Sequence, residues 1–216
     1  MPKFPEPPER AALEALGPEI RELPRAAPLG RIFMRGGAHP VEWNSFRHWG
    51  PTDARFDHHL PGPDGGGAEQ ARGVLYAAGP GGAGALATCV AEVFQTKRII
   101  NRSHGAPWFC VFATRRPLRL LDLAGRWPTR AGASAAIATG ARARARRWSA
   151  AVYEAYPMID GVIYRSSMAG DAEAVALYER AASALPERPQ FHRALEDPAL
   201  QRPLLDAAAA INYGLL

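Results

Sequence analysis

Residues 73–94 read GVLYAAGPGGAGALATCVAEVF, in which a strand pattern and a helix pattern are joined by a glycine-rich turn. Residues 74–78 are short, apolar and rich in β-branched and aromatic side chains, which predicts a strand. A glycine-rich turn follows, and the apolar spacing after it predicts a helix over about residues 84–97. Tyr76 on the strand and Glu92 on the helix are therefore expected on either side of one turn.

The position of Glu92 on that helix is open to two interpretations. An apolar stripe with the spacing i, i+3, i+4, i+7, i+8 is predicted to be buried, and it consists of Leu86, Cys89, Val90, Val93 and Phe94. At about 100° per residue, Glu92 lies roughly 130° from the centre of this stripe. That angle is typical of a solvated glutamate. A glutamate whose carboxylate points into a cleft beside the sheet would have the same position relative to the apolar stripe.

The remaining elements do not alternate regularly along the chain. Further strands are predicted at residues 31–35, 108–114, 118–123 and 161–164, with residues 175–178 as another candidate. Helices are predicted at residues 134–156, with a break at Gly140, and at residues 198–213. This order favours an α+β fold, a mixed, bent β-sheet flanked by helices, over a doubly wound parallel sheet.

Composition indicates one domain of ordinary size. The chain has 216 residues, of which 47% are hydrophobic, enough for a sizeable core. Residues 1–29 are rich in proline and charge around an amphipathic stretch at 11–16, so they are expected to form an arm or a short helix packed on a single domain of residues 30–216. The stretch PGPDGGG, within residues 60–67, predicts a loop.

The chain lacks the features of a membrane or secreted protein. It contains no apolar run of the roughly 18 residues that a bilayer requires, and its start, MPKFPEPPER, does not resemble a signal peptide. We therefore expect a soluble, cytoplasmic protein with no membrane partner.

The cysteines and histidines do not have the spacing of a metal site. Cys89 and Cys110 lie in apolar stretches without a CxxC pattern, so two buried, reduced thiols are expected. His58 and His59 are adjacent, but three or four convergent ligands are needed to hold a metal. No metal is expected.

The net charge of +5 comes almost entirely from arginine. A local basic run contains Arg142, Arg144, Arg146 and Arg147. Because Arg142 and Arg146 have helical i,i+4 spacing on an alanine-rich segment, the run indicates a solvated helix face, with a docking surface for an acidic partner as the alternative. Direct nucleic-acid binding is not expected.

Five segments, in this order, resemble the RES family, named for its Arg, Glu and Ser, whose members are toxins of bacterial toxin–antitoxin pairs. The segments are Arg-Ile-Phe-Met-Arg at 31–35, Ala-Arg-Phe-Asp at 54–57, Gly-Val-Leu-Tyr-Ala-Ala at 73–78, Ala-Glu-Val-Phe at 91–94 and Asp-Gly-Val-Ile-Tyr-Arg-Ser-Ser at 160–167. The resemblance covers roughly residues 30–182. It implies an ADP-ribosyltransferase-like fold, NAD as the substrate, phosphate as an optional co-substrate, and a cognate antitoxin as partner.

The resemblance also implies the site residues. Arg55 matches the arginine of the family's Gly-Arg-Trp/Phe motif, and Tyr76 matches its Tyr-Ala-Ala strand. Glu92 matches the helix glutamate, and Ser166 matches the Tyr-x-Ser motif. The early arginine of the family matches Arg31 and Arg35 equally well. This chain departs from the family pattern at three positions, which are Ala54, Asp57 and Arg165.

These residue types suit cleavage of the bond between nicotinamide and ribose. The ribose gains oxocarbenium character, which the carboxylate of Glu92 can stabilise. Guanidinium groups match a pyrophosphate, so Arg31 or Arg55 is expected to clamp it. Tyr76 is expected beside the nicotinamide, and Ser166 is expected to bond the ribose or the carboxamide.

Two further functions stay open on the sequence. The Ser-Thr-Ser and Glu-x-Glu motifs of arginine-specific ADP-ribosyltransferases are absent from the chain, which leaves hydrolysis, phosphorolysis or another acceptor. One alternative is a mono-ADP-ribosyltransferase that modifies a cellular protein. The other is a catalytically silent RES domain that serves as an interaction module.

Overall fold

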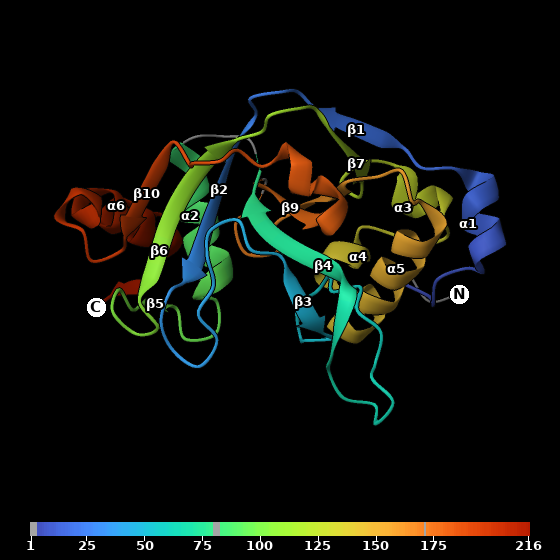
Figure 1. Cartoon of the computed structure of the whole chain (residues 1–216), viewed down its shortest axis with the longest axis horizontal. Helices are drawn as coiled ribbons and strands as arrows, with labels where there is room; N and C mark the ends of the chain where they lie inside the picture. The colour runs from blue at the N-terminus through green and yellow to red at the C-terminus, as the bar shows by residue number, and fades with distance from the viewer. Residues whose placement is uncertain (1–3, 80–82, 171) are drawn as a thin grey trace.

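The computed structural model describes residues 4–79, 83–170 and 172–216. Within these residues a nine-stranded sheet has the order β1-β7-β8-β9-β4-β2-β6-β10, with β3 paired to β4 (Figure 1). Strands β7 and β8 are parallel, whereas the other neighbours in this sheet are antiparallel. The sheet is therefore mixed and flanked by helices, which confirms the α+β class.

The strands are β1 (Ile20–Leu23), β2 (Pro28–Met34), β3 (Arg47–Gly50), β4 (Ala68–Ala78), β5 (Ile99–Ile100), β6 (Pro107–Ala113), β7 (Leu118–Asp122), β8 (Gly161–Arg165), β9 (Glu173–Tyr178), β10 (Phe191–Ala194) and β11 (Gly214–Leu215). The helices are α1 (Arg10–Leu16), α2 (Ala83–Val93), α3 (Trp127–Arg130), α4 (Ala136–Thr139), α5 (Arg142–Ala155) and α6 (Gln201–Ile211), with 3₁₀ helices η1 (Glu179–Ala184) and η2 (Pro198–Leu200). A small second sheet pairs β11 with β5.

The main sheet opens between β2 and β4. These two strands pair at one position, Gly30 with Ala78, whereas β2 pairs with β6 along its whole length. From the Gly30–Ala78 pair the two strands spread apart, as Figure 1 shows. The sheet therefore has two halves that diverge from this pair of residues.

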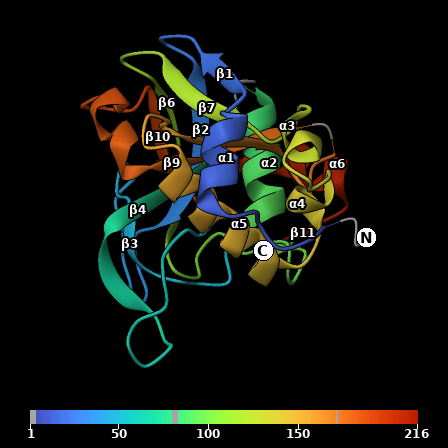
Figure 2. The same cartoon turned by 90° about the vertical axis from the view of Figure 1, so that its right-hand side faces the viewer.

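Each half of the sheet has its own helices. Helices α2 and α6 pack on the β2–β6 half, through buried residues such as Val90, Leu204 and Phe109. Helices α1, α3, α4 and α5 pack on the other half, where Trp127 and Trp148 are fully buried. Figure 2, seen from the α1 side, shows α1 and α5 in front of the sheet.

Helix α2 lies directly over the point where the two halves meet. A Cβ atom on Gly30 would stand 2.7 Å from the Cβ of Ala85, closer than real carbon contacts allow. Glycine at this position therefore lets α2 approach the sheet. The close approach brings the C-terminal turn of α2, which carries Glu92, to the opening between β2 and β4.

The six strands predicted from sequence are all present, with ends shifted by a few residues. The helix expected at 134–156 is two helices, because α4 ends before Gly140 and α5 begins at Arg142. Helix α2 ends at Val93, earlier than the expected residue 97. Residues 61–67 form no helix or strand, as expected of a loop.

The N-terminal segment does more than pack on the surface. The amphipathic stretch at 11–16 lies in α1, as expected, and the following residues form β1, which pairs with β7 at the edge of the sheet. The short strands β1, β3, β5, β10 and β11 were not predicted. They are two to four residues long and gain their order from neighbouring strands rather than from their own sequence. None of the described helices is long and apolar enough to cross a membrane.

Candidate active site

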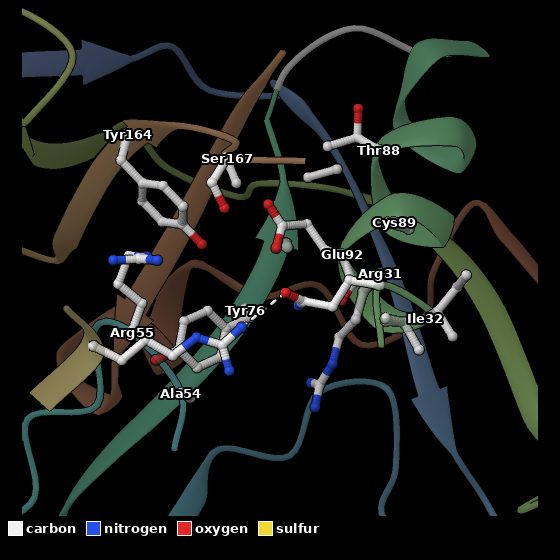
Figure 3. A pocket seen from close by; sticks show the side chains of 16 residues that line it. Arg31, Ile32, Ala54, Arg55, Tyr76, Thr88, Cys89, Glu92, Tyr164 and Ser167 are labelled. Atoms are coloured by element: carbon white, nitrogen blue, oxygen red, sulfur yellow. Dashed lines mark hydrogen bonds between the residues drawn. The ribbon is translucent and has the colours of Figure 1, made fainter. Parts of the chain in front are cut away.

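A cavity of about 240 Å³ lies at the opening between β2 and β4, beside α2 (Figure 3). Segments far apart in the sequence line it, and its polar side chains include Arg31, Arg55, Tyr76, Thr88, Glu92, Gln95, Arg142, Tyr164 and Ser167. Three of these are arginines and one is a carboxylate, so the described lining carries an excess of positive charge. Such a cavity favours an anionic ligand.

Glu92 points into this cavity, and Ser166 holds its carboxylate. The hydroxyl of Ser166 donates a hydrogen bond of 2.5 Å to Oε1 of Glu92. The same hydroxyl oxygen accepts bonds from the backbone amides of Met168 and Ala169, at 3.1 and 3.0 Å. The direction of Ser166 is therefore determined by the turn that follows β8, and its one proton is directed to Glu92.

The neighbouring serine, Ser167, is the one that lines the cavity. Ser166 itself is 4% exposed and is not among the lining residues. The sequence predicted that Ser166 would bond the ribose or the carboxamide. In this structure its hydroxyl donates to the carboxylate of Glu92, which suits a residue that positions Glu92, and its bond to a substrate stays a prediction.

Arg31, on β2, is half-buried at the edge of the cavity. Its guanidinium donates to the backbone carbonyl oxygens of Trp43 and Ser45, at 2.7 and 3.1 Å. No carboxylate within the described residues forms an ion pair with it. Burial lowers the pKa of Arg31 to about 10. An anion entering the cavity would supply the missing negative charge.

Arg35, the second candidate on this segment, lies outside the cavity. It is exposed, pairs with Glu42 at 3.1 Å, and stacks over the ring of Trp108 at 4.7 Å. Strand alternation would place residues 31 and 35 on the same face, but β2 ends at Met34 and the alternation ends with it. Of the two arginines that the sequence could not separate, the structure brings Arg31 to Glu92 and Tyr76.

Arg55 approaches the cavity from the segment after β3. Its guanidinium donates a hydrogen bond to the carbonyl oxygen of Gly140, in the break between α4 and α5. Burial and the positive charge of nearby Arg142 lower the pKa of Arg55, against the opposing effect of Glu92. Two guanidinium groups held near each other beside a cavity favour an anion there.

Tyr76 and Tyr164 contribute aromatic rings to the cavity. Figure 3 shows Tyr164 and Arg55 on the side of the cavity opposite Arg31 and Ile32. Burial raises the pKa of both phenols, so both stay neutral at physiological pH. The hydroxyl of Tyr76 is buried and has no hydrogen-bond partner within the described residues. The ring of Tyr164 packs against Phe56, with centroids 4.3 Å apart.

Sequence reasoning missed several of the lining residues, among them Tyr164, Val93 and Arg142. Tyr164 belongs to the quoted Tyr-x-Ser motif, and alternation along β8 could have identified it, since Tyr164 and Ser166 are two residues apart. Val93 was expected in the buried stripe, yet it is 39% exposed and lines the cavity. Arg142 was interpreted as part of a solvated face, and no periodic signal separates it from its neighbours.

The other arginines of the basic run are engaged in ion pairs. Arg144 and Arg147 both bond the carboxylate of Glu6, and Arg146 bonds Asp53 at 3.1 Å. These pairs compensate much of the local charge, which weakens the interpretation of the run as a docking surface for an acidic partner.

The histidine pair lies apart from the cavity. His59 bonds Asp57 through Nδ1 at 2.5 Å, and His58 stacks on Tyr153 with ring centroids 4.4 Å apart. Within the described ranges, no three His, Cys, Asp or Glu side chains converge as metal ligands. Cys89 and Cys110 are buried free thiols, as expected, and burial raises the pKa of each to about 12.

Comparison with known proteins agrees with these observations. Residues 28–199 match the RES domain family. A chain in the crystal structure of the M. tuberculosis MbcT-MbcA toxin-antitoxin complex has a similar fold, with a TM-score of 0.54 and 15% sequence identity over 90% of this chain and 95% of that chain. No curated protein matches the sequence significantly.

Proposed function

This chain belongs to the RES domain family, and on that premise we propose that it is the toxin of a toxin–antitoxin pair that consumes NAD+ by cleaving the bond between nicotinamide and ribose. One observation carries the proposal. Glu92, held by Ser166, shares a cavity with two arginines of the family motifs, Arg31 and Arg55. A carboxylate for a developing cation and guanidiniums for phosphates are the groups that this substrate requires.

In the proposed reaction the bond between C1′ of the ribose and the nicotinamide nitrogen breaks. Its electron pair moves to the nicotinamide, which leaves as a neutral ring, while C1′ becomes positive. The carboxylate of Glu92 stabilises that charge, as a carboxylate does in glycoside cleavage. An acceptor oxygen then bonds C1′ and loses its proton, and with water as acceptor the product is ADP-ribose.

The size of the cavity limits how much of the substrate it can enclose. Pockets that enclose a drug-sized ligand measure about 300–1,000 Å³. At about 240 Å³, the cavity suits the nicotinamide–ribose end of a dinucleotide better than the whole molecule. Tyr76 and Tyr164 then bound the nicotinamide, whose positive ring favours an aromatic neighbour.

The phosphates belong beside the arginines that line the cavity. Arg31 is half-buried and its guanidinium bonds carbonyl oxygens, so a phosphate oxygen would compensate a charge that the described residues leave without an ion-pair partner. Arg55 is half-buried and is repelled by the positive charge of Arg142, so a phosphate oxygen would compensate its charge as well. We assign both residues to binding.

Family membership and the fold similarity to a chain of a toxin–antitoxin complex support the toxin role and an antitoxin partner. Unrestrained loss of NAD+ would harm the cell that makes the protein. The positive lining of the cavity suggests how an inhibitor could act, since a carboxylate presented by the antitoxin would bind where the pyrophosphate binds.

Product analysis tests the reaction. The purified protein is incubated with NAD+, with and without inorganic phosphate, and the products are identified by mass spectrometry. Free ADP-ribose means hydrolysis, ADP-ribose 1″-phosphate means phosphorolysis, and an ADP-ribosylated protein means the transferase alternative. If NAD+ stays intact for hours, the enzymatic function is contradicted, and the remaining alternative is a catalytically silent interaction module.

Co-expression tests the toxin role. Expression of the protein alone should arrest growth and deplete cellular NAD+. Co-expression with the neighbouring reading frame should restore growth and yield a complex without NAD+-consuming activity. A protein that is harmless at high level and binds no neighbour is not a toxin, even if slow NAD+ hydrolysis is measured.

A further inference from the structure

Arg142 lines the cavity but has no counterpart among the family motifs quoted above. It is the first residue of α5, and the first turn of this helix contains no acidic side chain. One end of its guanidinium donates to Oδ2 of Asp53 at 2.9 Å, and the other donates to Oε1 of Gln95 at 2.7 Å. Arg142 thus bridges the segment before Arg55 and the segment after α2.

The ion pair of Arg142 with Asp53 is a weak one. The Arg142 side chain is 39% exposed and that of Asp53 is 77% exposed, so water screens their attraction. Asp53 also binds Arg146, at 3.1 Å. If Arg142 turned away, Asp53 would keep a positive partner. The structure therefore allows Arg142 to exchange partners at small cost.

The surroundings of Arg142 favour an anion. Arg55 lines the same cavity as Arg142. The cavity lining also contains the carboxylate of Glu92, which accepts a hydrogen bond from Ser166. A phosphate between the two guanidiniums would relieve their mutual repulsion, and Arg142 can offer it two N–H groups once it leaves Asp53.

We propose that Arg142 is a substrate-recognition residue that exchanges Asp53 for a phosphate group of the nucleotide whose ribose lies at Glu92. The inference rests on the proposed function for the orientation of the ligand. Gln95, whose amide nitrogen donates to the backbone oxygen of Glu92 at 2.7 Å, holds Arg142 close to the reacting end of the cavity until the exchange occurs.

Calorimetric titration with ADP-ribose measures this binding without any turnover. Arg142→Ala should weaken ADP-ribose binding about tenfold or more, the usual effect of losing a hydrogen bond to a charged group. Arg146→Ala is the matched control, because Arg146 shares Asp53 on the same helix but does not line the cavity. Its affinity for ADP-ribose should stay within about twofold of the wild type, as expected for loss of an exposed ion pair.

Two further titrations separate recognition from support of the cavity wall. Asp53→Asn should bind ADP-ribose at least as tightly as the wild type, because it releases Arg142. Nicotinamide riboside, which has no phosphate, should bind Arg142→Ala and wild type equally. The proposal is wrong if Arg142→Ala and Arg146→Ala weaken ADP-ribose binding equally, or if Asp53→Asn binds ADP-ribose more weakly than the wild type. It is also wrong if Arg142→Ala loses affinity for ADP-ribose and for nicotinamide riboside equally, or if the wild-type protein does not bind ADP-ribose.

The proposed function can fail separately. If the wild type binds ADP-ribose through Arg142 but leaves NAD+ intact, the recognition role stands and the NAD+-consuming activity does not. If NAD+ is consumed at the same KM by wild type and Arg142→Ala, the activity stands and the role of Arg142 does not. Thermal denaturation of each variant shows that the compared proteins are folded.

Discussion

Ser166 donates its only hydroxyl proton to Glu92, a residue 74 positions earlier in the chain, across the opening between the two halves of the sheet. Two backbone amides bind the same hydroxyl oxygen and direct that proton. The carboxylate is therefore held in one orientation before any ligand enters. Preorganised groups of this kind are effective in stabilising a developing charge.

Glu92→Gln keeps the shape of the side chain and removes its negative charge. NAD+ consumption should fall by about 10²- to 10³-fold, the usual cost of one preorganised electrostatic group. Steady-state kinetics and circular dichroism measure the loss and confirm the fold. A folded variant with wild-type activity would show that Glu92 does not stabilise the reacting ribose.

Ser166→Ala should act through Glu92. We expect kcat to fall about tenfold, the effect of one hydrogen bond to a charged group, with KM little changed. In a double-mutant cycle, Ser166→Ala should add almost nothing to Glu92→Gln, because the residue that it positions is already disabled. Additive effects would mean that Ser166 contacts the substrate by itself, as the sequence had suggested.

Arg55→Ala should raise KM for NAD+ about tenfold or more, because phosphate charges change little while the glycosidic bond breaks. Arg35→Ala is the control, since Arg35 is exposed, paired with Glu42 and away from the cavity. The control should have wild-type kinetics. A large loss of kcat at constant KM in Arg55→Ala would assign Arg55 to the reacting ribose instead.

Gly30→Ala should destabilise the protein by about 1–3 kcal/mol, because the new methyl group overpacks the contact between β2 and α2. The ideal Cβ meets Ala85 at 2.7 Å. Gly84→Ala, on α2 itself, meets nothing within 4 Å and should be neutral or stabilise by at most about 1 kcal/mol. Urea denaturation compares the two. If Gly30→Ala and Gly84→Ala were equally stable, α2 would shift to accommodate the new methyl group without loss of stability.

Stability should fall with acid because of His58. Burial, together with the electrostatic effects of neighbouring His59 and Arg72, lowers its pKa from 6.5 to about 3. The unfolded chain binds this proton below about pH 6.5 and the folded protein does not, so stability is full above that pH and declines as the pH falls toward 3.

Between pH 7 and pH 5 this effect is about 2 kcal/mol, at 1.36 kcal/mol per pH unit below 6.5. Because both ring nitrogens of His58 lack hydrogen-bond partners within the described residues, His58→Phe should fold and lose less stability over this interval. His39→Ala, at an exposed position, should keep the wild-type loss. A wild type equally stable at pH 7 and pH 5 would show that His58 is not buried neutral.

Local patterns in the sequence were sufficient to predict the strands and helices whose own residues have clear alternation, helical spacing or a glycine break. Apolar strands such as β4, β6 and β8 and the helix break at Gly140 follow from neighbouring residues, since alternation, helical spacing and glycine act over a few positions. The ordered motifs also placed Arg55, Tyr76, Glu92 and Ser166 together, and the structure brings all four to one region.

Only the tertiary structure decided which side chains meet in the cavity. Spacing on α2 was equally consistent with a solvated Glu92, and the opening of the sheet at Gly30 and Ala78 determines that it points inward. The end of β2 separates Arg31 from Arg35, and the docking of α5 separates Arg142 from Arg146. Periodicity describes one element at a time, whereas a cavity depends on how several elements diverge, and that depends on packing between residues far apart in the chain.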